Sequence, residues 1–385
     1  MGRFTLLLGK GEGLSALKEV CKDIDYVALS DTDYTIEEIA HKVDKMQGID
    51  FAIANGLVFA PIVDLLKNKG VAVVGPDSKM EKLERDRVYG KILCSKAGIG
   101  TGKWFTIPVE KIDEIEWEFP CYIKHIDGLG GTTSFKVDSV RQIKNLILAY
   151  GYPEGLVVEK PLDGLEFSIN VMIGKQDWKL LGMNYDVKDS VGKVVENVYS
   201  APTTRLNDLV QNKFKMLFDS IQLMGYTGIL ALTIFITEDG IEMIEMNARL
   251  GYGSAFSYLN NVKNSYDMLR SCAYGESIPD PQFKNAYGLE YMVNSGLKRE
   301  EYDLIVGLLR PLDDTVYLIK NNIINFGVDF SNGSAPYVLA TYGDSIKEIE
   351  GRIYRNLSRV DVPLLERNKI DMSRLDKIEE RLVTL

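Results

Sequence analysis

Three polar residues stand at alternate positions in a segment that is otherwise apolar. Met246 and Ala248 separate Glu245, Asn247 and Arg249, so an extended strand would place these three on one face. A carboxylate and an amide oxygen are hard ligands that suit magnesium bridging phosphate groups. An arginine beside them can hold a transferring phosphoryl group or a carboxylate. The pattern predicts a metal- and phosphate-binding face; the alternative is the solvent-exposed side of an amphipathic strand.

A second candidate is the segment 127–134, which reads DGLGGTTS. It lies between an expected strand ending at Lys124 and another beginning at Phe135, and it combines glycines with hydroxyl side chains. Such a loop is rich in accessible backbone N–H groups and suits a polyphosphate. The alternative is an ordinary hairpin loop. The candidate phosphate-binding residues here are Lys124, Asp127, Gly128, Gly130, Gly131, Thr132 and Thr133.

A third candidate is the connector between the apolar run 156–158 and the strand expected from residue 166. Backbone groups of residues 159–162 can pair with the edge of an adenine, and a carboxylate seven residues after Glu159 can hold two ribose hydroxyls. The alternative is a surface loop with two solvated acids. The candidate nucleoside-binding residues are Glu159, Lys160, Leu162 and Glu166.

A glycine-rich turn at residues 9–13, GKGEG, follows the first apolar run. Glycines between a strand and a helix can bring backbone amides close to an anion at the helix N-terminus. The spacing matches neither G-x-G-x-x-G nor a Walker loop. A tight strand-to-helix turn is therefore the alternative.

The elements that would position these residues begin with alternating strands and helices. Strands are expected at 4–8, 26–29, 51–54 and 71–74, and helices from about residue 14, at 36–45 and at 62–68. This rhythm predicts a parallel sheet covered on both faces. Ser78 is the expected cap of a further helix that runs to Lys96.

The pattern changes after residue 100 to many strands, with helices only near 140–150 and 206–224. This texture predicts an α+β region with mostly antiparallel sheet. A turn-rich boundary at 278–281 precedes short strands and a helix at 346–357. The chain is thus expected to be a multidomain α/β and α+β protein. Its expected domains are 1–100, 101–280 (a nucleotide lobe at about 103–184, a metal and substrate lobe at about 185–280) and 281–385.

Composition excludes several classes of protein. The 385 residues are 45% hydrophobic, which is ordinary for a globular chain. The net charge of −10 argues against a basic surface that binds duplex nucleic acid. The four cysteines form no C-x-x-C pair and there are only two histidines, which argues against a zinc site or Ser-His-Asp chemistry. No secretory signal and no long apolar run is visible, so a cytoplasmic protein without a membrane span is expected.

The candidate segments occur in the order typical of the ATP-grasp superfamily. Over nearly its whole length, the chain resembles the glycinamide ribonucleotide synthetase (phosphoribosylamine–glycine ligase) family. The segments that carry the resemblance are 74–76, 83–84, 96–99, 127–129, 159–168, 244–251, 342–348 and 367–371. The resemblance implies an N-terminal pre-ATP-grasp domain, a two-lobed ATP-grasp domain and a small C-terminal α+β domain.

The resemblance also assigns roles to individual residues. Arg87 stands where the family has a lysine that touches the nucleotide phosphates, and Lys124 matches the second phosphate-binding lysine. Residues 159–162 match the adenine hinge and Glu166 the ribose-binding acid. Glu245 and Asn247 match the magnesium ligands, and Arg249 the arginine near the transferred phosphate. The implied cofactors are ATP and Mg2+ or Mn2+.

The acceptor end departs from the family. The family's Gly-Gly-Arg-Glu-His turn is replaced by 11–15, GEGLS, and its flap lysine by Thr132 and Thr133. Of its Asp-His-Lys motif only Asp186 and Lys188 remain. The sequence YGS at 252–254 replaces Asp-Pro-Glu. The substrate-contact candidates are Asp186, Lys188, Arg249 and Gly251.

The resemblance therefore implies an ADP-forming ligase that joins a small-molecule carboxylate to an amine through an acyl phosphate, with a changed acceptor. The catalytic candidates are Arg87, Lys124 and Arg249, which would act by positioning and by neutralising phosphate charge. Two alternatives are a phosphoribosylamine–glycine ligase of purine biosynthesis and a non-catalytic nucleotide-binding regulator. The expected assembly is a monomer or homodimer with no nucleic-acid or membrane partner.

Overall fold

The computed structural model describes most of the chain. The described residues are 2–127, 134–152, 155–188, 194–250, 255–293, 316–320, 337–357, 377–378, 380–381 and 384. The candidates Gly128, Gly130, Gly131, Thr132, Thr133 and Gly251 lie outside them. Among the described residues, no helix is both long enough and apolar enough to cross a membrane.

The N-terminal region forms the expected parallel sheet, in the order β2-β1-β3-β4. Its strands are β1 (Phe4–Leu8), β2 (Tyr26–Leu29), β3 (Ile49–Ala54) and β4 (Ala72–Val74). Its helices are α1 (Gly11–Val20), α2 (Ile36–Lys45) and α3 (Ala60–Asn68), which follows the short 3-10 helix η1 (Leu57–Phe59). The alternation of strands and helices thus correctly predicted a parallel sheet. Helix α1 begins at Gly11, three residues before the expected start, because the glycine turn is itself its first turn.

The expected helix up to Lys96 is two helices, α4 (Lys82–Arg85) and α5 (Arg87–Lys96). Asp86 separates them in an extended conformation, and its carboxylate accepts a hydrogen bond from the N–H of Tyr89 at 2.8 Å. The expectation that Ser78 caps this helix is wrong. Asp77 instead accepts from the N–H of Met80 at 2.9 Å, and carboxylates are at least as good as hydroxyls at such positions.

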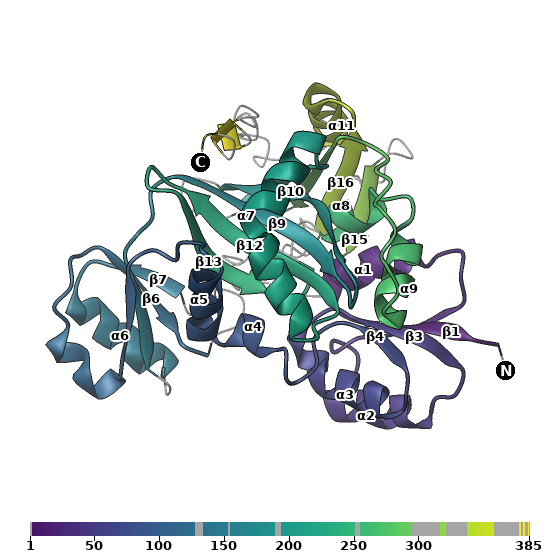
Figure 1. Cartoon of the computed structure of the whole chain (residues 1–385), viewed down its shortest axis with the longest axis horizontal. Helices are drawn as coiled ribbons and strands as arrows, with labels where there is room; N and C mark the ends of the chain where they lie inside the picture. Colours follow the sequence, from purple (N-terminus) through teal and green to yellow (C-terminus); the bar gives the residue numbers. More distant parts are fainter. Residues whose placement is uncertain are drawn as a thin grey trace.

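A small antiparallel sheet, in the order β5-β8-β6-β7, forms the lobe at the left of Figure 1. It contains β5 (Trp104–Ile107), β6 (Cys121–His125), β7 (Ser134–Val137) and β8 (Leu156–Glu159), with η2 (Val109–Glu114) and α6 (Val140–Tyr150). Buried apolar residues such as Ile123, Val158 and Ile143 form its own core.

A large sheet occupies the centre, in the order β13-β12-β9-β10-β11-β14-β16-β15. Its strands are β9 (Leu165–Ile173), β10 (Trp178–Lys188), β11 (Val194–Ser200), β12 (Gly228–Ile236), β13 (Ile241–Asn247), β14 (Tyr287–Val293), β15 (Val316–Lys320) and β16 (Tyr337–Gly343). Neighbouring strands of this sheet pair antiparallel, as expected. Strands β14 to β16 continue the same sheet, while the proposed domain boundaries remain a prediction.

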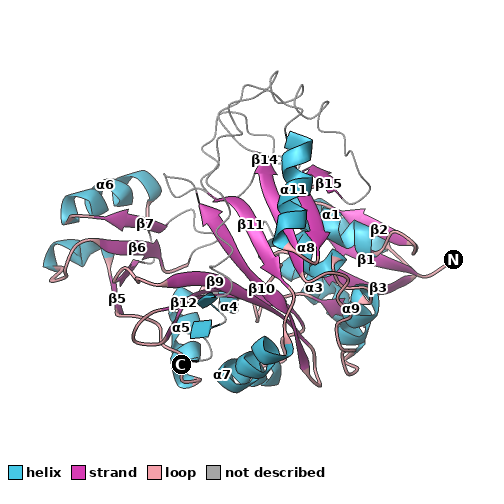
Figure 2. Ribbon diagram, turned by 90° about the horizontal axis from the view of Figure 1, so that it is seen from above, coloured by secondary structure: helices cyan, strands magenta, loops and turns pink. Residues whose placement is uncertain are grey.

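Helix α7 (Thr204–Leu223) lies across one face of β9, β10 and β12 (Figure 1). Phe167, Ile169 and Val171 of β9 point into the core that it covers. Side chains alternate along a strand, so Glu166 and Ser168 face the other way. Viewed from above, the sheet extends from the small lobe towards the N-terminal domain (Figure 2).

Three helices follow β13 and close the described fold: α8 (Ala255–Asn260), α9 (Ser265–Tyr274) and α11 (Ile346–Leu357). Only α11 was expected. Helix α9 buries Met268, Leu269 and Cys272, a short apolar stripe that sequence periodicity does not reveal clearly. All four cysteines are free and buried.

Candidate active site

Strand β13 carries the predicted metal pair on the face opposite Met246, which is buried. The amide of Asn247 donates to Oε1 of Glu245 at 3.2 Å, so the two side chains lie side by side. Thr233 of β12 pairs with Glu245 in register, and its hydroxyl shares a hydrogen bond with Ser168 at 3.1 Å. The Glu245 side chain is 34% exposed, so its carboxylate can be reached from solvent.

Two arginines flank this pair. A guanidinium nitrogen of Arg87 lies 3.7 Å from Oε2 of Glu245, and Arg249 donates to Oδ1 of Asn247 at 3.3 Å. Burial acts to raise the pKa of Glu245, but the positive charges of Arg87 and Lys124 hold it below its usual value. Glu245 is therefore a carboxylate at neutral pH, surrounded by the three cations that the sequence singled out.

The donor set fits a magnesium ion that a nucleotide helps to hold. Within the described residues, no group of three or more His, Cys, Asp and Glu side chains could hold a metal ion. Glu245 and Asn247 supply only a carboxylate and an amide oxygen, and magnesium is commonly bound by one or two carboxylates together with substrate phosphates. The excess of cations around the pair suits those phosphates.

Glu84 of α4, whose role sequence analysis missed, holds Arg249 in place. Its carboxylate accepts from Nε of Arg249 and from the N–H of Ala248, both at 3.0 Å. Burial raises the pKa of Glu84, and the attraction of Arg249 offsets this only in part. The end of β13 is thus tied to α4 by a buried carboxylate.

The small lobe contributes a second charged group. Lys124 is buried on β6, and its Nζ lies 2.7 Å from Oε2 of Glu159, the last residue of β8. Lys91 of α5, which sequence analysis did not single out, lies 3.1 Å from Oε1 of the same carboxylate. The structure therefore brings Lys124 and Glu159 together. A possible signal for Lys91 was its position four residues after Arg87, on the same helical face.

The connector after Glu159 is shaped by its backbone. The N–H of Lys160 donates to the carbonyl of Lys103 at 3.0 Å. A Cβ on Gly102 would lie 3.2 Å from Leu162, so the leucine packs closely on this glycine. Glu166 follows on the face of the large sheet that also carries Ser168, and so on the side of Glu245.

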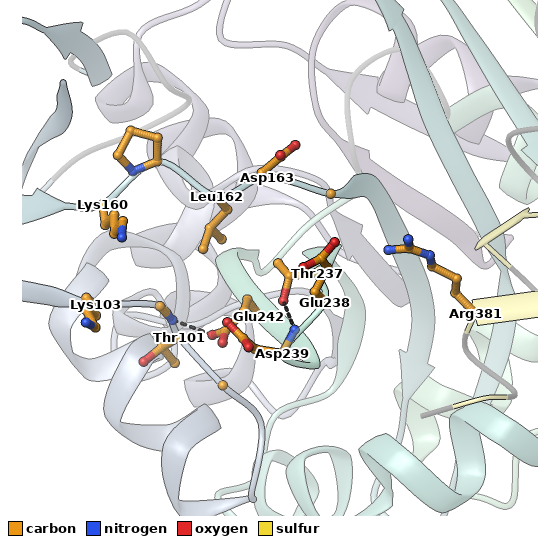
Figure 3. A pocket seen from close by; sticks show the side chains of 14 residues that line it. Thr101, Lys103, Lys160, Leu162, Asp163, Thr237, Glu238, Asp239, Glu242 and Arg381 are labelled. Atoms are coloured by element: carbon orange, nitrogen blue, oxygen red, sulfur yellow. Dashed lines mark hydrogen bonds between the residues drawn. The ribbon is translucent and has the colours of Figure 1, made fainter.

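A cavity of about 740 Å³ lies beside this connector (Figure 3). Leu162 points towards it from the connector, and Arg381 reaches in from the opposite side. Thr237, which follows β12, and Glu242 of β13 form another wall. Glu242 also accepts a hydrogen bond from the N–H of Gly102. The predicted hinge residues Lys160 and Leu162 thus border an open space of nucleoside size.

The remaining candidates are placed only in part. Asp127 is the first residue of the glycine-rich segment 127–134. Its Oδ1 lies 3.6 Å from Nε of Arg85, and its backbone forms an isolated β-bridge with Asp86. Asp186 and Lys188 lie on β10, but their side chains are outside the described residues.

The N-terminal glycine turn serves close packing. A Cβ on Gly13 would lie 2.0 Å from Nδ2 of Asn55, whose Oδ1 accepts from the N–H of Leu250 at 3.0 Å. The glycine therefore lets Asn55 join the N-terminal domain to the segment after β13. This agrees with the alternative of a tight strand-to-helix turn.

Comparison with known proteins identifies the domain that carries the site. Residues 102–253 match the ATP-grasp domain family. Among curated proteins, the phosphoribosylamine–glycine ligase of Halalkalibacterium halodurans is 23% identical over 364 residues, which cover 87% of this chain and 84% of the relative.

Solved structures share the fold. The phosphoribosylamine–glycine ligase of Thermotoga maritima has a TM-score of 0.70 at 16% identity and covers 92% of this chain and 96% of its own. The biotin carboxylase domain of Hydrogenobacter thermophilus 2-oxoglutarate carboxylase, solved with MgADP, ADP and bicarbonate, has a TM-score of 0.68 at 17% identity. That match covers 93% of this chain and 90% of the neighbour.

Proposed function

Because this chain is an ATP-grasp enzyme of the class that forms carbon–nitrogen bonds, we propose that it is an ATP- and Mg2+-dependent carboxylate–amine ligase. It would activate a small-molecule carboxylate as an acyl phosphate, release ADP and join the acyl group to an amine. Its acceptor would differ from that of the phosphoribosylamine–glycine ligases.

The observation that carries the proposal is the convergence of three cations on one ionised carboxylate. Arg87 and Lys124 hold the pKa of Glu245 low against the effect of burial, and Arg249 lies beside Asn247. Such an excess of positive charge around a hard-ligand pair is what a triphosphate with its metal requires. A nucleotide-binding protein without turnover would have less use for this arrangement.

The residues act mainly by positioning and charge. An oxygen of the substrate carboxylate attacks the γ-phosphorus, and the bond from that phosphorus to the ADP oxygen breaks. Arg87 and Lys124 neutralise the phosphates, and Arg249 orients the carboxylate or the transferring group. Glu245 and Asn247 would hold magnesium, which would supply further charge neutralisation. The amine nitrogen then attacks the acyl carbon, phosphate leaves and the amine loses a proton.

The altered first turn supports a changed acceptor. Where the related family carries an arginine and a histidine, this chain has Gly13 and Ser15. Asn55 fills the space between Gly13 and Leu250. This neutral junction borders the segment that follows Arg249. An acceptor bound there would meet amides and backbone groups instead of an arginine and a histidine.

The test is ADP release with Mg2+, screened across amino acids and simple amines, singly and in pairs. ADP formation that needs one acid and one amine supports the proposal. Activity with glycine and phosphoribosylamine alone would replace it with the purine-pathway ligase. Glu245→Ala should abolish turnover, whereas Glu37→Ala, an exposed carboxylate on α2, should not. Turnover that survives Glu245→Ala would refute the assigned metal site.

A further inference from the structure

A buried lysine lies behind the phosphate-binding lysine of the proposed site. The side chain of Lys91 is only 2% exposed, and its Nζ lies 3.1 Å from Oε1 of Glu159. It also donates to the carbonyl of Thr101 at 3.2 Å and lies 5.7 Å from the ring centre of Trp104. The surroundings of Lys91 thus come from α5, the segment after it, and the end of β8.

Burying an ammonium group is costly, so its position calls for a compensating interaction. Burial lowers the pKa of Lys91, and the negative charge of Glu159 opposes that effect. For Glu159, burial acts to raise the pKa, but Lys124 and Lys91 together hold it below its usual value. Glu159 therefore stabilises the ammonium group of Lys91, and both lysines stabilise the carboxylate, although the two lysines repel each other.

The charge count of this trio has a functional consequence. Lys124 lies 2.7 Å from Glu159, a contact that on its own would form a neutral pair and weaken the field of Lys124 at a nearby phosphate. Lys91 engages the other oxygen of the same carboxylate and leaves the trio with one net positive charge. Lys91 itself is enclosed and cannot easily reach a ligand.

We propose that Lys91 is a positioning residue: by sharing the charge of Glu159, it leaves Lys124 with the positive charge that binds the nucleotide phosphates. This inference rests on the proposed function, because it takes Lys124 to contact phosphate. Lys91 would also fix the orientation of the Glu159 carboxylate, and so the position of Lys124 within the site.

The test compares affinities for MgATP, ADP and adenosine by isothermal titration calorimetry. Lys91→Met should weaken MgATP and ADP binding roughly tenfold to a hundredfold, by analogy with the loss of a residue that positions a metal ligand. Adenosine affinity should stay within about twofold, because adenosine carries no phosphate for Lys124 to bind. Lys96→Met, an exposed lysine on the same helix, should change neither.

A second variant separates charge from structural damage. The double variant Lys91→Met/Glu159→Gln removes one positive and one negative charge, so Lys124 regains an unopposed charge and the ratio of ATP to adenosine affinity should return to that of the wild type. This comparison also carries the test if Lys91→Met alone fails to fold. A ratio that stays low in the double variant would overturn the proposal.

Other results would be equally decisive. An equal loss of ATP and adenosine affinity in Lys91→Met would show a merely structural role, and unchanged ATP affinity would show that Lys91 has no effect on the site. Lys124→Met serves as the calibration. If this variant keeps full affinity for ATP, the assigned nucleotide site is itself wrong, and that failure is distinct from a failure of Lys91.

Discussion

Glu84 offers a test of whether charge or hydrogen bonding matters at the end of β13. The carboxylate is buried, yet burial raises its pKa more than Arg249 lowers it, so ionisation costs the folded state free energy. Its contribution to stability must then come mainly from the hydrogen bonds to Ala248 and Arg249, at 3.0 Å each. Glu84→Gln keeps an acceptor for one of them.

The expected magnitudes differ between two substitutions. Glu84→Gln should cost no more than about 1 kcal/mol of unfolding free energy, the value of one ordinary hydrogen bond. Glu84→Ala leaves the buried N–H of Ala248 unsatisfied and removes the carboxylate that pairs with Arg249, whose side chain is 14% exposed. Loss of one partner of a buried ion pair costs about 3–5 kcal/mol. Both variants should lower the turnover number, because Arg249 is no longer oriented by a carboxylate.

Urea denaturation, with an unchanged m-value, measures the loss of unfolding free energy, and the rate of ADP release measures the turnover number. The pH dependence gives a further check. Because burial raises the folded pKa of Glu84 above its usual value of 4.5, the folded wild type binds an extra proton between that usual value and the raised one. This part of its stability is lost as the pH rises through the raised pKa. Glu84→Gln should lack this component. If Gln proved as destabilising as Ala, the charge itself would be stabilising and the reasoning would be wrong.

Two further predictions concern the hinge. Gly164 has a φ of +157°, and a Cβ there would lie 2.2 Å from the carbonyl oxygen of Ile236. Gly164→Ala should therefore lower the unfolding free energy in urea more than Gly240→Ala does. Gly240 has a similar φ, but a Cβ there would meet nothing within 4 Å, so its substitution should cost only about 1–3 kcal/mol of backbone strain. Equal losses in the two variants would contradict this prediction. The lowered pKa of Glu159 stabilises the fold above pH 4.5, and this stability is lost as the pH falls through the folded pKa. Glu159→Gln should therefore lose less unfolding free energy than the wild type on transfer from pH 7 to about pH 4, and an unchanged loss would show that Glu159 does not contribute.

Local sequence patterns predicted most of the fold. Short apolar runs and the alternation of apolar residues identified β1, β9 and β12, which are buried continuously or at every second residue. The same rule placed Glu245 and Asn247 together, and the structure agrees. Helix ends were less predictable, since Asp86 interrupts a helix that its neighbours would continue.

The missed site residues share a physical reason. Glu84 meets Arg249, and Lys91 meets Glu159, across long stretches of chain. No local periodicity reports such pairs, because each partner alone looks like a surface charge. Only the packing of α4 and α5 against the two sheets shows that these charges are buried.

The two halves of the proposed nucleotide site belong to different sheets. Lys124 and Glu159 sit on the four-stranded sheet, while Glu245 sits on the edge strand of the eight-stranded one. A triphosphate that contacts both would crosslink them without a covalent bond. The small lobe would then gain stability with nucleotide concentration, as any ligand that binds only the assembled state requires. ATP would in this way stabilise the arrangement of the two lobes as well as serve as a substrate.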